Sequence, residues 1–192
     1  MRFFLTSDDP KSKARALTLS KKLNIEIFKK PPQKQIKEFS EDYFFTCSKG
    51  RLFLKKGLRQ NSKPIFSDFD DWAKNYDDNL LKNSTKGLPA NFSCLDLTAG
   101  FGKDALEISK VVNCKSLVLV EKEAWVFELL VDGIKNISCS RAGGLLKKFK
   151  TFNMDNLEFL ESKNETFDLI YIDPMFLGVK KSKAKKHMQA LR

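Results

Sequence analysis

The clearest pattern in the sequence runs from residue 92 onward, where short apolar stretches alternate with longer segments whose apolar residues recur every three or four positions. The short stretches predict buried strands, and the longer segments predict helices. This alternation is typical of an α/β fold, in which a parallel sheet is connected by right-handed helical crossovers. The predicted strands are 92–97, 116–120, 150–153 and 167–172, and the predicted helices are 103–112, 124–136 and 157–162.

The first third of the chain has a different pattern and predicts a small α/β subdomain in front of this sheet. The predicted elements are a strand at 2–6, a helix at 11–23 that begins after Asp9-Pro10, a strand at 24–28, and a hairpin of strands 42–47 and 51–55. Beyond it, the segment at 64–69 is expected to be extended and the segment at 70–81 helical. Gly143-Gly144 predicts a loop. We therefore expect two parts, 1–60 and 61–192.

Composition limits the class of protein. The chain has 192 residues, of which 42% are apolar, enough for a core of ordinary size. No apolar stretch approaches the length of a membrane span, and the apolar start at 3–5 is too short for a signal peptide, so we expect a cytoplasmic protein without a membrane partner. Four scattered cysteines and one histidine favour reduced thiols and argue against a metal site.

The net charge is +11, which favours a polyanion such as nucleic acid as partner. A lysine-rich composition that serves only solubility is the alternative. The basic residues are dense at the end of the chain, where 179–192 contains no acid. Lysines there would hold phosphates if the segment lies beside an active site, and would form a solvated tail if it does not. The lysines concerned are Lys180, Lys181, Lys183, Lys185 and Lys186.

Residues 94–105 read Cys-Leu-Asp-Leu-Thr-Ala-Gly-Phe-Gly-Lys-Asp-Ala and combine the end of a strand, a Gly-x-Gly turn and the start of a helix. Gly100 and Gly102 permit positive φ and let the backbone approach a ligand closely. The free N–H groups of the helix start lie behind them. In open α/β sheets a ligand binds at this place, beyond the carboxyl end of the strand.

Two cofactors are compatible with this turn, a nicotinamide dinucleotide and S-adenosylmethionine, and an ordinary turn without a ligand is the third possibility. Glu121 ends the next strand and is suited to ribose hydroxyl groups. Asp96 and Thr98 favour S-adenosylmethionine. A carboxylate just before the glycines would repel a pyrophosphate, whereas it suits an ammonium and a sulfonium.

A second motif, Tyr-Ile-Asp-Pro-Met-Phe at 171–176, follows the fourth predicted strand and so belongs to the same edge of the sheet. An exocyclic amino group of a base is a poor nucleophile, because its lone pair is delocalised into the ring. Asp173 and the carbonyl group of Pro174 are suited to accept its two N–H bonds, and the fixed φ of proline holds that carbonyl still. Phe176 is suited to stack on the base. The motif is weak alone and strong beside the glycine turn.

With both motifs in hand, the chain resembles class I S-adenosylmethionine-dependent methyltransferases, and more narrowly the ribosomal RNA small subunit methyltransferase J family. The resemblance rests on 64–69, 96–105, 119–122 and 171–176, with the lysines that follow. It implies a Rossmann-like sheet, S-adenosylmethionine as cofactor, and methyl transfer to the exocyclic N2 of a guanine in 16S ribosomal RNA. The implied partner is that RNA or the small ribosomal subunit, with no metal; the oligomeric state stays open.

The resemblance also implies cofactor contacts, which fall on seven residues: Lys103, Asp104, Glu121, Lys122, Asp155, Asn156 and Asp173. Of these, Glu121 suits the ribose, Asp155 the adenine amino group, and Asp104 the methionine ammonium or a helix cap. Asp96, Gly100 and Gly102 complete the expected cofactor site. The expected catalytic residues are Asp173, Pro174 and Phe176.

Two departures from the family pattern leave alternatives open. The family has a basic, glycine-rich segment before the glycine turn, whereas 75–83 is acidic here and has no glycine. The chain also stops soon after the fourth strand, where a complete class I sheet continues with three more, so we expect a sheet that lacks its C-terminal strands. The alternatives are a methyltransferase acting on DNA adenine or protein glutamine, and a truncated relative that binds cofactor or RNA without turnover.

Overall fold

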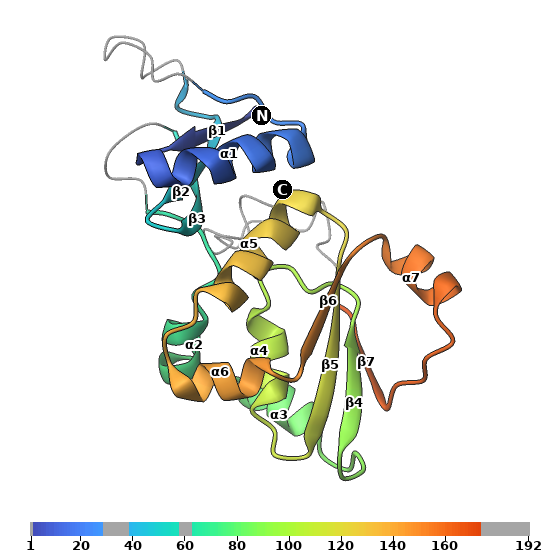
Figure 1. Ribbon diagram of the computed structural model, residues 1–192. Coiled ribbons are helices and arrows are strands. Elements are labelled where there is room, and N and C mark those ends of the chain that lie inside the picture. Colours follow the sequence, from blue (N-terminus) through green and yellow to red (C-terminus); the bar gives the residue numbers. More distant parts are fainter. Residues whose placement is uncertain (1, 29–38, 58–62, 174–192) are drawn as a thin grey trace. The chain divides into compact units, whose positions relative to one another are not determined.

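The computed structural model of the chain describes residues 2–28, 39–57 and 63–173 (Figure 1). The chain forms two compact units, Met1–Phe66 and Ser67–Arg192. They are called the N-terminal unit and the C-terminal unit below, and each is described by itself.

The N-terminal unit is a three-stranded sheet with one helix. Its elements are β1 (Phe3–Ser7), α1 (Pro10–Leu23), β2 (Tyr43–Ser48) and β3 (Arg51–Lys56), and the strand order is β1-β2-β3. β1 and β2 are parallel, and β3 returns antiparallel to β2. The predicted hairpin is confirmed. Its turn residues Lys49 and Gly50 have φ of 49° and 78°, the combination that a two-residue type I′ turn requires.

Helix α1 is well delimited by its caps. The side chain of Asp9 accepts a hydrogen bond from the Ser12 amide at 2.9 Å, and Asn24 ends the helix in the left-handed conformation. The predicted strand at 24–28 is wrong as a full strand, since only an isolated bridge joins Ile27 to Leu5. The reason is this cap: the amide of Ile25 still bonds back to the Ser20 carbonyl, so too little extended chain is left for a ladder.

The C-terminal unit begins with two short helices, α2 (Phe69–Asn75) and α3 (Asn79–Ser84). A single helix over 70–81 was expected, and this prediction is wrong because Tyr76 is extended between the two. Asp78 starts the second helix by accepting hydrogen bonds from the Leu80 and Leu81 amides at 2.9 and 3.1 Å. The local aspartates therefore serve as caps and ion-pair partners, including Asp77, which pairs with Lys82.

The sheet of this unit has four parallel strands in the order β6-β5-β4-β7. Its strands are β4 (Phe92–Asp96), β5 (Cys114–Glu121), β6 (Phe149–Asn153) and β7 (Leu169–Tyr171), and its helices are α4 (Lys103–Ser109), α5 (Ala124–Lys135), α6 (Ser140–Leu146) and α7 (Asn156–Ser162). The expected α/β fold with a Rossmann-like sheet is confirmed. From β4 the chain adds β5 and β6 on one side, and then β7 on the other side of β4. At such a switch in strand order a ligand crevice is expected beyond the carboxyl ends of the two strands, here β4 and β7.

Gly143-Gly144 lies inside α6, so the predicted loop is wrong. The helix forms in spite of its glycines because Asp70 of α2 holds its start. The Asp70 carboxylate accepts hydrogen bonds from the amides of Ser138 and Cys139, at 3.0 and 2.9 Å. Ala142 and Leu146 are buried and fix the other side of the helix.

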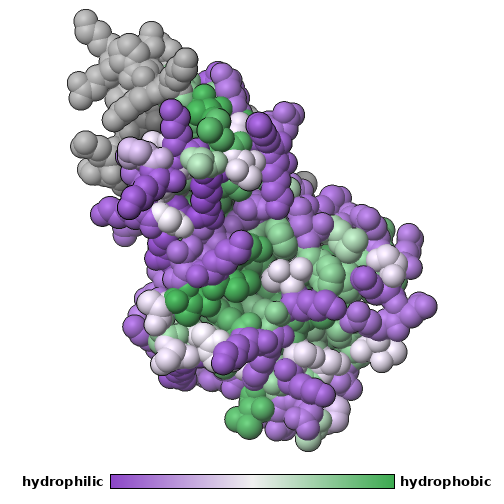
Figure 2. Space-filling model, viewed as in Figure 1, coloured by the Kyte–Doolittle hydropathy of each residue, from purple (hydrophilic) through white to green (hydrophobic). Residues whose placement is uncertain are grey.

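Both faces of the sheet carry apolar side chains, as the short continuous apolar stretches predict. On one face Cys94, Leu117 and Leu119 pack with residues of α2, α4, α5 and α6. On the other face, which α7 covers in part, Leu95, Val118 and Val120 pack with Phe159. The space-filling view shows apolar side chains at the surface of this unit among a mainly hydrophilic exterior (Figure 2). Among the described residues, no helix is long and apolar enough to cross a membrane.

Candidate active site

The glycine turn after β4 is fixed by both conformation and packing. Gly100 and Gly102 have φ of 54° and 82°. A Cβ atom at Gly102 would lie 2.6 Å from Leu130 Cδ1 and 2.9 Å from Phe69 Cζ, so position 102 has no room for a side chain. Ala99 donates its amide to the Val120 carbonyl at 3.0 Å, which ties the turn to the end of β5. The conformation of the turn at the carboxyl edge of the sheet is thus fixed by the packing around Gly102 and by this hydrogen bond.

Glu121, at the end of β5, holds this turn through a hydrogen bond. One carboxylate oxygen accepts the Gly100 amide at 2.8 Å, and the other accepts the Glu123 amide at 2.7 Å. Burial raises the pKa of Glu121, while the two amide donors act against the rise. Each oxygen keeps a further lone pair, so the carboxylate is able to accept two ligand hydroxyl groups as well.

Asp96 ends β4 and is 1% exposed. It accepts a hydrogen bond from the Thr98 amide at 2.9 Å. Burial raises the pKa of Asp96 to about 7, and the charges of Asp104, Glu121 and Asp173 add to the rise. Four carboxylates from four segments thus share one edge of the sheet.

Asp104, in the first turn of α4, meets the end of β7. The Tyr171 hydroxyl donates to its carboxylate at 3.1 Å. Burial, followed by the charges of Asp173 and Asp78, raises the pKa of Asp104 although the tyrosine donor lowers it. Burial together with the charge of Asp104 raises the pKa of Tyr171.

Asp173 is held beside this group by its own backbone. Its amide donates to Thr98 Oγ1 at 2.8 Å, and the amide of Leu97 donates to the Tyr171 carbonyl at 3.1 Å. These bonds connect the carboxyl ends of β4 and β7, which lie far apart in sequence. The structure therefore brings together six of the expected site residues: Asp96, Gly100, Gly102, Asp104, Glu121 and Asp173.

The basic residues expected at the site have protein partners. The ammonium of Lys103 lies 3.4 Å from the centroid of the Tyr76 ring. Lys122 pairs with Asp155 at 3.0 Å, and Asp155 also caps α7 by accepting the Leu157 amide at 2.9 Å. Asn156 is the first residue of α7. Lys122, Asp155 and Asn156 thus form a second group, at the ends of β5 and β6. Pro174, Phe176 and the lysines from Lys180 to Lys186 lie outside the described residues.

A buried ion pair beneath the site was missed in the sequence. Glu107 is fully buried in α4, and the Lys110 ammonium bonds to its carboxylate and to the Tyr76 carbonyl at 2.5 Å. The second carboxylate oxygen of Glu107 accepts the Asp78 amide at 3.1 Å. This pair fixes the link between α2 and α3, and with it the Tyr76 ring over Lys103. The only signal in the sequence was the i,i+3 spacing of two opposite charges.

Tyr171 was also missed as a site residue, and Thr98 was named only as favouring the cofactor, without its role in holding Asp173. Their roles depend on a contact between β4 and β7, which spacing along the chain does not reveal.

The carboxylates decide which cofactor fits. Burial raises the pKa values of Asp96, Asp104 and Glu121, and nearby carboxylates add to the rise, whereas Lys103 opposes it only at Asp104. A ligand with an ammonium and a sulfonium relieves this repulsion, whereas a pyrophosphate would add to it. S-adenosylmethionine fits the residues present. Among the described residues, no group of three or more His, Cys, Asp or Glu side chains is arranged to hold a metal ion.

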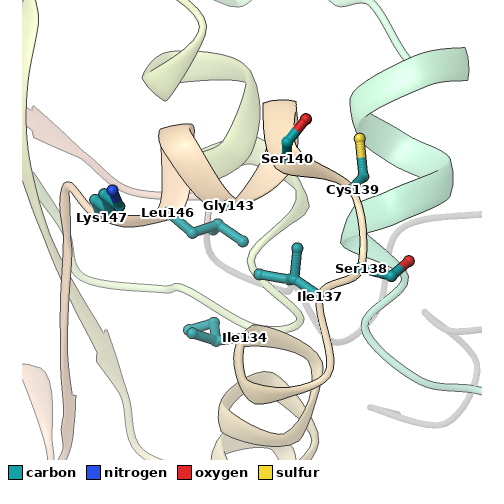
Figure 3. A pocket seen from close by; sticks show the side chains of 8 residues that line it. All are labelled: Ile134, Ile137, Ser138, Cys139, Ser140, Gly143, Leu146 and Lys147. Carbon is teal, nitrogen blue, oxygen red and sulfur yellow. The ribbon is translucent and has the colours of Figure 1, made fainter.

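A pocket of about 370 Å³ lies where α5 meets α6, lined mainly by apolar side chains with the Cys139 thiol and Lys147 at its border (Figure 3). Its residues run from the last turn of α5 to Lys147, just after α6. The C-terminal end of α5 returns to the amino edge of the parallel sheet, so this pocket is separate from the site at the carboxyl edge.

Comparison with known proteins gives the class. The model of the SAM-dependent methyltransferase family matches residues 33–192, and the chain belongs to this family. S-adenosylmethionine is therefore its cofactor, as the carboxylates indicate. A crystal structure of a SAM-dependent methyltransferase from Neisseria gonorrhoeae has a TM-score of 0.69 and 19% identity, with 90% of this chain and 70% of that chain covered, which confirms the fold.

The resemblance to ribosomal RNA small subunit methyltransferase J is also confirmed. A protein of that name from Francisella tularensis subsp. holarctica is 27% identical over 184 residues, covering 88% of this chain and 76% of the relative. Another from Hahella chejuensis is 30% identical over 161 residues, covering 78% of this chain and 59% of the relative.

Proposed function

We propose that this methyltransferase transfers the methyl group of S-adenosylmethionine to the exocyclic N2 of a guanine in 16S ribosomal RNA. The names of the relatives support ribosomal RNA of the small subunit as substrate. One observation supports an amine as the methyl acceptor: Thr98 accepts a hydrogen bond from the Asp173 amide. This bond holds the acidic residue of an Asp-Pro-x-aromatic motif beside the glycine turn and its carboxylates.

Each carboxylate has a role in holding the cofactor. Glu121 binds the ribose hydroxyl groups through the lone pairs that the two amide donors leave. Asp104 receives the methionine ammonium in the first turn of α4, where Tyr171 orients its carboxylate. Buried Asp96 adds negative charge below the turn. Gly100 and Gly102 let the ligand lie close to the backbone.

Lys103, Lys122, Asp155 and Asn156 complete the cofactor contacts in this proposal. Asp155 accepts the adenine amino group, and it has to do so while it caps α7 and pairs with Lys122. Its ion pair thus orients the carboxylate and also keeps its charge, because Lys122 lowers the pKa of Asp155.

The acceptor amine is held by the second motif. Asp173 and the Pro174 carbonyl accept its N–H groups, and Phe176 stacks on a base that has left its own stack. When bound, S-adenosylmethionine supplies a methyl group activated by positive sulfur. The residues of the chain then orient the amine in line with that group, which supplies most of the rate. Asp173 stabilises the positive charge that develops on nitrogen. No metal takes part.

Basic residues hold the rest of the RNA. In this proposal Lys180, Lys181, Lys183, Lys185 and Lys186 contact phosphates near the target base. A protein that modifies the small ribosomal subunit works in the cytoplasm and needs no membrane partner.

The test is incubation of small ribosomal subunits that lack the modification with S-adenosylmethionine labelled in its methyl group, followed by digestion of the RNA to nucleosides. Label in N2-methylguanosine is expected. Label in N6-methyladenosine or in ribosomal protein would replace the guanine assignment by another amine. Tight cofactor binding without any transfer of label would identify a binding protein without turnover.

A further inference from the structure

The positive charge of the protein is concentrated in one unit. Residues Met1–Phe66 contain 16 Lys and Arg against 6 Asp and Glu. Residues Ser67–Arg192 contain 19 against 18, although the lysine-rich end of the chain belongs to them. The excess charge thus lies almost entirely in the unit that contains none of the expected cofactor-site residues, and it needs an explanation of its own.

Helix α1 carries much of this charge in an ordered way. It contains five basic residues and no acidic one. Lys11, Arg15 and Lys22 are spaced by four and seven residues, which sets them on one side of the helix. Ala16 and Leu19 are buried against the rest of the unit, and the basic side borders this buried side, because Leu19 follows Arg15 by four residues. Lys11 and Lys22 are exposed, and Arg15 is partly so.

The hairpin turn extends this side of the helix. Arg15 donates to the Gly50 carbonyl at 2.7 Å, and the Lys49 amide donates to the Asp9 carboxylate at 3.0 Å. The exposed side chain of Lys49 therefore stands beside the first turn of α1. We call Lys11, Arg15, Lys22 and Lys49 the basic stripe. Asp9 is an acid beside the stripe, and three hydrogen bonds from Ser12 and Lys49 already satisfy its carboxylate.

The composition of this surface favours nucleic acid over a lipid membrane. A helix that lies in a membrane surface buries a broad apolar face among the lipids. The apolar side of α1 is used within its own unit, and Leu17 is the large hydrophobic of α1 that is exposed, at 46%. In Figure 2 hydrophilic side chains likewise predominate on the described surface of this unit. A surface with regularly spaced lysine and arginine side chains and few exposed apolar ones is suited to the phosphates of an RNA backbone.

We propose that the basic stripe is the surface by which the N-terminal unit binds the phosphate backbone of the RNA substrate. The inference rests on the proposed function for the identity of the RNA. It also accounts for the position of the charge. The carboxylates of the cofactor site repel phosphates, so a separate basic unit adds to the affinity that the lysines proposed near the target base supply.

The test compares two variants of the full chain that lose equal charge. The stripe variant carries Lys11→Gln, Lys22→Gln and Lys49→Asn; asparagine tolerates the left-handed conformation at position 49. Arg15 is kept because it holds the hairpin turn. The control variant carries Lys74→Gln, Lys86→Gln and Lys115→Gln, three exposed lysines of the C-terminal unit. Binding to a protein-free 16S RNA transcript is measured from 50 to 200 mM salt, along with S-adenosylmethionine affinity and thermal stability.

The stripe variant is expected to bind the transcript roughly tenfold to a hundredfold more weakly at low salt, with a shallower dependence of affinity on salt, because fewer counterions are released. Cofactor affinity should not change. The control variant should lose much less affinity. Equal losses in the two variants, an unchanged salt dependence, or binding of anionic phospholipid vesicles instead of RNA would overturn the proposal. If the stripe variant melts early, Lys11→Glu alone is measured in the same way and has to reproduce the loss.

The result separates this proposal from the proposed function. Stripe-dependent RNA binding by a protein that transfers no label to guanine would keep the docking surface and remove the activity. Transfer of label to guanine with equal RNA binding by both variants would keep the activity and remove the docking surface.

Discussion

The carboxylates of the N-terminal unit and those at the cofactor site of the C-terminal unit are held in opposite ways. In the N-terminal unit Asp9 and Asp42 are satisfied by donors, and the hydrogen bonds from Ser12 and from Arg2 lower their pKa values. In the C-terminal unit burial raises the pKa values of Asp96, Asp104 and Glu121, which also repel one another. The first arrangement stabilises local structure, whereas the second stores unfavourable charge at the edge of a sheet.

The difference reflects the charge of what each unit binds. A cationic cofactor is bound well by carboxylates that lie close together, because binding relieves their repulsion. The same carboxylates would oppose a polyanion, so basic residues outside this group have to attract it. In this proposal the separation into an acidic site and a basic unit lets one chain bind ligands of opposite charge.

The largest effect on stability should come from breaking the buried pair in the C-terminal unit. Lys110→Met leaves the Glu107 charge buried without its partner and is expected to lower the free energy of unfolding by about 3–5 kcal/mol. The matched change in the N-terminal unit, Lys56→Met, removes an exposed pair with Glu41 and should change it by less than about 1 kcal/mol. Denaturant unfolding measures both. Equal losses would contradict the distinction between the two units.

The largest effect on turnover should come from Asp173. Asp173→Ala removes the group that orients the acceptor amine, and turnover is expected to fall on the order of a hundredfold or more. Cofactor affinity should change much less. Asp8→Ala, which removes an exposed carboxylate of the N-terminal unit, serves as control and should leave turnover unchanged. Single-turnover assays with labelled cofactor decide between them, and a loss that appears only in cofactor affinity would reassign Asp173 to cofactor binding.

Glu121→Gln should separate the two binding functions. It removes a charge from the ribose site, so S-adenosylmethionine affinity is expected to fall by about 1.5–3 kcal/mol, which is about tenfold to a hundredfold. RNA affinity should stay the same, the reverse of the result expected for the stripe variant. Glu161→Gln, an exposed carboxylate of α7, controls for the loss of one charge. Calorimetry that finds normal cofactor affinity in Glu121→Gln would exclude this residue from the cofactor site.

The smallest effect is a pH dependence that only the acidic site should show. Cofactor affinity is expected to fall about tenfold from pH 8 to pH 6, because Asp96, with a pKa of about 7, takes up a proton and loses its attraction for a cation. Asp96→Asn should flatten this dependence. Asp42→Asn in the N-terminal unit should not alter it, and a dependence equal in both variants would place the titrating group elsewhere.

The stability of the protein without cofactor should change with pH in the opposite direction. The pKa of Asp96 rises from 3.8 to about 7 on folding, so the folded state binds more protons between these values. The contribution of Asp96 to the free energy of unfolding therefore falls as pH rises through this window and is level above it. Thermal melting at constant ionic strength, with Asp96→Asn as control, measures the change.

The sequence by itself determined the sheet and the position of the site. Continuous apolar stretches alternating with amphipathic segments require a parallel sheet buried on both faces, because no other arrangement buries both patterns. The glycines at 100 and 102 and the acids around them were predicted to belong to one site for a local reason. Residues just beyond the ends of parallel strands meet at the same edge whatever the rest of the chain does.

Only the tertiary structure decided how the chain is fixed between these elements. The break at Tyr76, the helix that contains Gly143-Gly144 and the loss of the strand at 24–28 all depend on capping contacts. Asp70, for example, starts a helix almost seventy residues further along the chain. A propensity summed over a window of sequence does not contain such a distant partner.

For the chemistry of the site, too, the sequence determined one part and the tertiary structure the other. The sequence named Asp96, Asp104, Glu121 and Asp173, since each stands next to a strand end or a turn. It did not show that Thr98 anchors Asp173, because that bond connects the end of β4 with the end of β7. Nor did it show that Tyr171 orients Asp104, because that bond connects β7 with α4. Nor did it show the raised pKa values, because these depend on burial and on distances between charges, which exist only once the strands are side by side.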